Sequence, residues 1–208
     1  MGEMPEAVRR EYDSLNTMAS TTHYHWQLWL QLYDGGEKVE LLRRFGGIVF
    51  GRIQYMMLAD VVLGICRLTD PPNVPSNQRR ESLGIDRLIN AVEAADPGLP
   101  DRLKLREIMK ELKTRSKLFR EIRNRFLAHR DLETWNQLGT FPNQQEIDEA
   151  LGLAAKIMNA VRLHYENATV SYSIFPSVGD GNDFMRQLRD HAHHLDQIPR
   201  PWMPDKGD

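Results

Sequence analysis

Residues 105–129 read LREIMKELKTRSKLFREIRNRFLAH, and this stretch decides the fold class. Its apolar side chains recur at spacings of three, four and seven, which is the period of one face of an α-helix. The next position of this stripe is His129, so an ionisable imidazole stands where a core residue is expected. The spacing predicts a helix over about 101–135. The apolar stripe consists of Leu105, Ile108, Leu112, Phe119, Ile122 and Phe126.

Helical spacing also dominates the rest of the chain, and clusters of Gly, Pro and Asp end each helical stretch. Asn143 and Glu146 form a capping-box-like pattern at the start of one stretch. Residues 168–175 are rich in β-branched and aromatic side chains, which favours a short extended piece without a partner strand. The helices are predicted over about 6–33, 38–68, 83–95, 101–135, 143–165 and 183–198.

These stretches predict an all-α protein, a single helical bundle of about five to six helices over residues 1–198 with a Pro-rich C-terminal tail over 199–208. Cys66 is the single cysteine and cannot form an internal disulfide, which fits a core thiol in a reducing compartment. No signal peptide is expected. The apolar stretch 45–66 is interrupted by Arg52 and Asp60, so it is predicted to be a buried helix. We therefore expect a cytoplasmic protein without a membrane partner.

The distribution of charge is uneven. The whole chain carries a net charge of -2, yet residues 102–130 contain eleven Lys or Arg and three Glu, a local excess of eight positive charges. Such a basic segment is typical of a nucleic-acid contact, although a solvated helix face is the commoner cause of a charged run. The candidate RNA-binding residues are Lys117, Arg120, Arg125 and Arg130.

Arg123 and His129 flank Phe126 by about 60° on either side of a straight helix. Burying an Arg without a partner costs a large amount of free energy. The presence of an Arg and a His on one packed face therefore calls for an explanation. A symmetric homodimer supplies one, because two copies of this face would line a cleft between subunits. His can exchange protons near pH 7, and Arg can stabilise charge on a phosphoryl group. The pair suits metal-free cleavage of RNA by its own 2′-OH.

The motif Arg123-Asn124, four residues and then His129 resembles the signature of the HEPN superfamily. The blocks Leu58-Ala59-Asp60 and Arg67-Leu68-Thr69-Asp70, the helix start at Ser82-Leu83 and the run from Arg123 to Asp131 resemble its bacterial abortive-infection branch. The resemblance covers most of the chain. It implies a helical bundle that dimerises and cleaves RNA without a metal or other cofactor, in phage defence or toxin–antitoxin systems.

By this resemblance Arg123 would stabilise the phosphate, His129 would act as general base or acid, and Asn124 would orient them. On a straight helix Asn124 points away from Phe126, so either the helix is distorted there or Asn124 holds a neighbouring helix. Asp131 stands where some members have a Tyr that a partner enzyme modifies with a nucleotide, so that modification is not expected. Asp131 is instead a candidate for a residue that positions the catalytic side chains.

Asp60 lies among apolar residues and needs a partner, for which Arg52, Arg67 and Arg123 are candidates. A pair with Arg123 would make Asp60 a positioning residue, although an internal ion pair is the more common role. The residues around His191 and His194 resemble a metal cluster, but helical spacing separates them and no metal is predicted. Two other functions stay open: a non-catalytic HEPN module that binds RNA, nucleotide or protein, and a structural bundle that docks an antitoxin.

Overall fold

The computed structural model describes residues 3–71, 82–124, 142–173 and 179–197. Within these ranges every regular element is a helix, which confirms the predicted all-α class. The eight helices described are α1 (Glu6–Tyr33), α2 (Gly36–Thr69), α3 (Ile85–Ala95), α4 (Leu99–Arg102), α5 (Leu105–Arg115), α6 (Lys117–Ile122), α8 (Gln144–Glu166) and α9 (Gly181–Gln197).

The prediction of five to six helices was too low because the stretch predicted as one helix over 101–135 is divided. Lys104 adopts a left-handed conformation with φ 56°, which ends α4 and starts α5. Ser116, with ψ near 1°, separates α5 from α6. The apolar spacing continues across both breaks, so the spacing alone does not reveal them. Residues 125–135 of the predicted helix lie outside the described residues.

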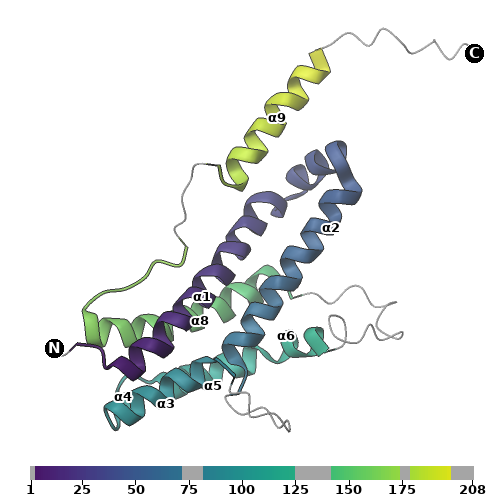
Figure 1. Ribbon diagram of the computed structural model, residues 1–208. Coiled ribbons are helices and arrows are strands. Elements are labelled where there is room, and N and C mark those ends of the chain that lie inside the picture. The colour runs from purple at the N-terminus through teal and green to yellow at the C-terminus, as the bar shows by residue number, and fades with distance from the viewer. Residues whose placement is uncertain (1–2, 72–81, 125–141, 174–178, 198–208) are drawn as a thin grey trace, which may run out of the picture.

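The two longest helices described, α1 and α2, form a long antiparallel hairpin (Figure 1). Gly35, at φ 104°, makes the turn between the two helices in a backbone region that favours glycine. Further along, Gly64 packs directly on α1: a Cβ built on it would lie 2.4 Å from Oγ1 of Thr22. The two helices therefore approach each other closely where the main core begins.

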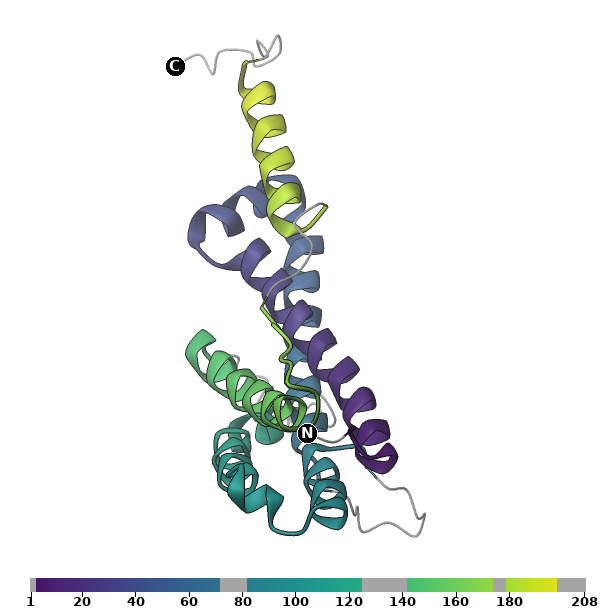
Figure 2. The same cartoon turned by 90° about the vertical axis from the view of Figure 1, so that its left-hand side faces the viewer.

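The main hydrophobic core lies at one end of this hairpin, where α3, α4, α5, α6 and α8 surround it (Figure 2). Trp26 and Phe119 are among its largest fully buried side chains. The start of α8 carries the predicted capping box, in which Asn143 and Glu146 each accept a hydrogen bond from the other's backbone N–H. The described residues of 168–175 form neither a helix nor a strand.

At the other end of the hairpin, α9 packs against the ends of α1 and α2 that adjoin their turn (Figures 1 and 2). We call α9 together with these helix ends the distal arm. A separate small cluster of Tyr33, Leu42 and Met185 holds it together. Arg44 pairs with Asp196, 2.7 Å apart, and this bond ties α2 to α9.

The prediction that 45–66 is a buried helix is only half correct. From Ala59 onward most of the apolar side chains of α2 are buried, whereas Ile48 is 87% exposed and Met56 is 65% exposed. By length and composition alone, α2 is the one helix in the described part of the chain that could cross a membrane.

Candidate nucleic-acid site at the end of α2

Arg123 and Asn124 lie in a π-helical turn directly after α6. The buried side chains of Phe119 and Ile122 fix α6 against the core, so the turn that follows has a defined position. A π turn is wider than an α turn and changes the direction in which its side chains point. The helix is therefore distorted at Asn124, which was one of the two explanations left open by the sequence.

The guanidinium of Arg123 is held from two sides. Its Nη1 donates to both carboxylate oxygens of Asp70, at 2.9 and 3.1 Å, and its Nε donates to Oδ1 of Asn124 at 3.2 Å. No acceptor for Nη2 is found among the described residues. The Arg123 side chain is 28% exposed, so part of it is accessible to solvent.

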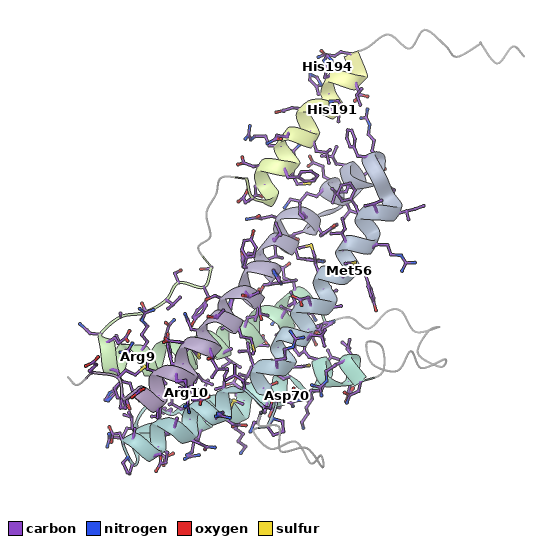
Figure 3. The ribbon with its side chains drawn as sticks, viewed as in Figure 1. Arg9, Arg10, Met56, Asp70, His191 and His194 are labelled. Atoms are coloured by element: carbon purple, nitrogen blue, oxygen red, sulfur yellow. The ribbon has the colours of Figure 1, made fainter. Side chains whose placement is uncertain are left out.

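Asp70 is the residue at which α2 ends, as Figure 3 shows. Its backbone is pressed against the start of α3, because a Cβ built on Gly84 would lie 2.5 Å from the Asp70 carbonyl oxygen. Only glycine fits at this approach without a shift of the backbone. Gly84 thus helps to set where Asp70, and through it Arg123, lies.

Arg120 is fixed to the same end of α2. Its Nη2 donates to the carbonyl oxygen of Thr69 at 2.9 Å, and its Nη1 donates to that of Lys113 at 3.5 Å. Carbonyl oxygens carry partial negative charge only, so within the described part of the chain the positive charge of Arg120 is oriented without being cancelled by a carboxylate. Arg120 and Arg123 therefore present two oriented cations side by side.

The thiol of Cys66 lies one helical turn before Asp70 and is fully buried, as the sequence predicted for a core thiol. Burial raises the pKa of Cys66 to about 11, and the nearby carboxylate of Asp70 acts in the same direction. A thiol with so high a pKa stays protonated and is a poor nucleophile near neutral pH.

Asp60 does not join this site. Its Oδ2 lies 2.5 Å from Nδ1 of His25 on α1, so its partner is none of the three arginines considered from the sequence. Asp60 precedes Asp70 by ten residues, which is about 15 Å along a helix. The carboxylate that positions Arg123 is Asp70 instead.

The structure brings Arg123, Asn124 and Arg120 together, and Lys117 lies exposed on α6 near them. The other predicted site residues, His129, Arg125, Arg130 and Asp131, lie outside the described residues. In the distal arm, the ring of His191 packs on Phe45, with centroids 5.7 Å apart. Among the residues described, no group of three or more His, Cys, Asp or Glu could hold a metal ion.

Sequence reasoning missed Asp70 and Gly84. Asp70 was quoted only as part of the matching block Arg67-Leu68-Thr69-Asp70, and no role was assigned to it. The available signal was its place directly before Pro71-Pro72, because the residue before a proline is disfavoured in the helical conformation and leaves the helix there. Gly84 gave no signal beyond being a glycine ahead of a helix.

Comparison with known proteins agrees with the resemblance noted from the motif. The model of the HEPN family AbiU2 matches residues 5–184, which is most of the chain. No curated protein and no solved structure gives a significant match. The matched region contains α1 to α8, the beginning of α9, the π turn with Arg123 and Asn124, and the position of His129. The chain therefore belongs to the AbiU2 family, a HEPN family associated with abortive infection.

Proposed function

We propose that this protein is a metal-independent endoribonuclease that acts in bacterial phage defence or a toxin–antitoxin system. The observation that carries the proposal is the position of Arg123: Asp70 and Asn124 orient its guanidinium, the described residues offer no acceptor for its Nη2, and its side chain is 28% exposed. An arginine held in this way can bind two oxygens of a phosphate with little loss of side-chain entropy. The family assignment supports the same reading.

The proposed reaction is attack of the RNA 2′-OH on the adjacent phosphorus. The O2′–P bond forms, the P–O5′ bond breaks, and the products are a 2′,3′-cyclic phosphate and a free 5′-OH. His129 takes the 2′-OH proton or delivers one to the leaving 5′ oxygen. Arg123 stabilises the additional negative charge on the phosphoryl oxygens in the transition state. Asn124 and Asp70 act by keeping Arg123 in place.

We further propose that two copies of the chain form a homodimer along α2. Exposed apolar side chains form a stripe on the outer face of this helix: Ile48 (87% exposed), Val49 (61%) and Met56 (65%). Met56 and Asp70 are fourteen residues apart, which is about four turns, so they lie on the same side of α2. A second copy that covers the stripe and continues along the same side of α2 for about 21 Å would reach the Arg123 site, which would make the site composite.

A second copy explains this stripe better than a bilayer does. Arg52 lies between Ile48 and Met56 and is exposed, and a charged side chain at the centre of a bilayer is costly. At a protein interface the same Arg can reach the polar rim. We accordingly propose a cytoplasmic protein without a membrane partner, with RNA as its substrate and an antitoxin as a possible protein partner.

The test is cleavage of end-labelled total RNA in EDTA by the wild type, Arg123→Ala and His129→Ala. Arg186→Ala is the matched control, because Arg186 is an exposed arginine paired within its own helix to Asp183. Wild type and control are expected to leave 2′,3′-cyclic phosphate ends, and both site variants to lose activity by roughly 100-fold or more. Intact RNA after incubation with folded, dimeric wild type contradicts the proposal, as does full activity of either site variant.

A non-catalytic HEPN module is the second candidate, and one observation favours it. The charge of Arg123 is already balanced by Asp70, as in an ion pair with a purely structural role. Such a module would bind RNA, nucleotide or a protein without cleaving it. In that case Arg123→Ala would change stability, whereas RNA would remain intact with every variant.

A further inference from the structure

A second feature of the molecule is a hollow of about 440 Å³ between α3 and the α5–α6 segment. Its floor is apolar and rigid, since Ile89 and Met109 in its lining are almost fully buried. Its rim is dominated by positive charge. The charged residues that line it are Asp86, Arg106, Lys110, Lys113, Lys117 and Arg120.

The five cations follow one another at spacings of four, three, four and three residues, as the positions Arg106, Lys110, Lys113, Lys117 and Arg120 show. Within each helix, residues at these spacings share one face. Although Ser116 separates α5 from α6, the cations of both helices line the same hollow. Three residues after Arg120 lies Arg123, which belongs to the proposed catalytic site. At about 1.5 Å per helical residue, the part of the row on α5, from Arg106 to Lys113, is roughly 10 Å long. We call the five cations the cationic row.

The cations of the row differ in how far their charge is balanced. Arg106 approaches Glu93 and Asp101, at 3.5 and 3.6 Å, and Lys113 lies 2.6 Å from Asp86. Arg120 donates to carbonyl oxygens alone within the described part of the chain.

Lys110 and Lys117 are exposed, and the described residues offer neither of them an ion-pair partner. Among the described residues, the uncompensated charge of the row therefore lies at Lys110, Lys117 and Arg120, and the last two are the members nearest Arg123.

We propose that the cationic row binds the phosphodiester backbone of single-stranded RNA and leads it to Arg123. The inference that the RNA is led to Arg123 rests on the proposed function, whereas binding of RNA to the row does not depend on catalysis. A row of cations along one hollow matches the repeating charge of a nucleic-acid strand. The flexible side chains of Lys110 and Lys117 can each contact a phosphate, and the fixed guanidinium of Arg120 holds the strand next to Arg123.

Contacts of this kind are made to the backbone, and they carry no sequence information. The row is therefore expected to bind strands of different sequence with similar affinity. An acidic protein segment could also be attracted to it, and such a partner would not require the regular spacing of phosphates.

The experiment measures binding of a short fluorescent 2′-O-methyl RNA by anisotropy, at several salt concentrations between about 50 and 200 mM NaCl. The 2′-O-methyl groups prevent attack on the phosphate, so binding is observed without cleavage. The full-length wild type is compared with Lys110→Gln/Lys117→Gln and with Lys156→Gln. Lys156 is an exposed lysine of α8 that does not line the hollow.

The double variant is expected to bind roughly tenfold more weakly, and its slope of log K against log salt should be shallower by about 1.4. Lys156→Gln should match the wild type. Equal affinity and equal slope for wild type and double variant overturn the proposal, as does wild type that fails to bind the RNA at about 50 mM NaCl. Wild type that prefers a poly-glutamate peptide to the RNA also overturns it, in favour of an acidic protein partner.

Arg123→Ala separates this proposal from the nuclease proposal. It is expected to bind the 2′-O-methyl RNA within about threefold of wild type, because it leaves the uncompensated lysines in place. If the wild type binds RNA through the cationic row but never cleaves it, the nuclease proposal is contradicted and the RNA-binding proposal stands. Cleavage that survives unchanged in the double variant, together with unchanged binding, would remove the row and keep the nuclease.

Discussion

Asp70 accepts two hydrogen bonds from Nη1 of Arg123, although the two residues are 53 positions apart in the chain. This contact joins the end of α2 to the π turn that follows α6. Because Gly84 presses on the backbone of Asp70, three separate segments meet at this ion pair. The position of Arg123 is therefore a property of the tertiary structure and not of its own helix.

Replacing Asp70 should impair cleavage by releasing Arg123. Asp70→Asn keeps an acceptor and is expected to lower kcat a few-fold, whereas Asp70→Ala should lower it roughly tenfold. Both effects should fall mainly on kcat, because Lys110, Lys117 and Arg120 still bind the substrate. The measurement is single-turnover RNA cleavage. Adding Asp70→Ala to Arg123→Ala should cause no further loss, since both changes remove the same interaction. Additive losses would show that Asp70 acts independently of Arg123.

Gly84→Ala should act on the same site from a distance. The new methyl group would lie 2.5 Å from the Asp70 carbonyl oxygen, so the end of α2 or the start of α3 must move. We expect a loss of cleavage similar to that of Asp70→Ala and a destabilisation of about 1 to 3 kcal/mol. Single-turnover kinetics and thermal unfolding measure the two effects. Unchanged cleavage in a destabilised protein would separate Gly84 from the positioning of Arg123.

Gly64→Ala should destabilise the hairpin and leave the chemistry of the site unchanged. Its methyl group would meet the buried side chain of Thr22 at 2.4 Å, and the two helices have little room to separate. The expected cost is about 1 to 3 kcal/mol in the free energy of unfolding, measured with urea. Gly152→Ala is the control, because nothing lies within 4 Å of its added Cβ. It should be neutral or stabilising by up to about 1 kcal/mol. Equal stability of the two variants would contradict the close approach of α1 and α2.

The fold was largely predictable because most of its determinants are local. The helix over Glu6–Tyr33 begins and ends where the apolar period and the following Asp34-Gly35-Gly36 indicate. The capping box at Asn143 and Glu146 depends on residues three apart. By contrast, the breaks at Lys104 and Ser116 interrupt no pattern, since both lie in stretches that keep helical spacing.

The site was only partly predictable. The motif pointed to Arg123 and Asn124, and the direction of Asn124 left a distorted helix as one of two explanations. The partner of Arg123 could not be chosen, because Asp60 and Asp70 are both acidic residues near the end of the same helix. The choice depends on where α6 crosses α2, which is a matter of packing. The sequence also did not predict the exposed apolar stripe of Ile48, Val49 and Met56. An apolar helix has the same sequence pattern whether a core or a second molecule covers it.

Ile48→Glu/Met56→Glu should convert a dimer into a monomer. Both side chains are highly exposed in the isolated chain, so the charges cost little there, but a dimer would bury them without partners. Light scattering at tens of micromolar protein, an order-of-magnitude choice for an interface of standard size, should detect the change. Leu163→Glu on α8 is the matched control, because Leu163 is a single exposed apolar residue, 49% exposed, outside the stripe. A wild type that is already monomeric would contradict the dimer.

His23 should make the protein less stable in mild acid. Burial lowers the pKa of His23 from 6.5 to about 4, and its ring stacks on Tyr172 with centroids 5.0 Å apart. Between these two pH values the unfolded chain binds a proton that the folded protein does not, so stability falls as the pH decreases. The slope approaches about 1.4 kcal/mol per pH unit, which gives a loss of about 2 kcal/mol between pH 7 and 5. His23→Phe keeps an aromatic ring against Tyr172 but has no proton to bind, so its free energy of unfolding should decrease less over this range by about that amount. Urea unfolding at both pH values measures the difference. Parallel pH dependences of wild type and variant would mean that His23 is not the group that titrates.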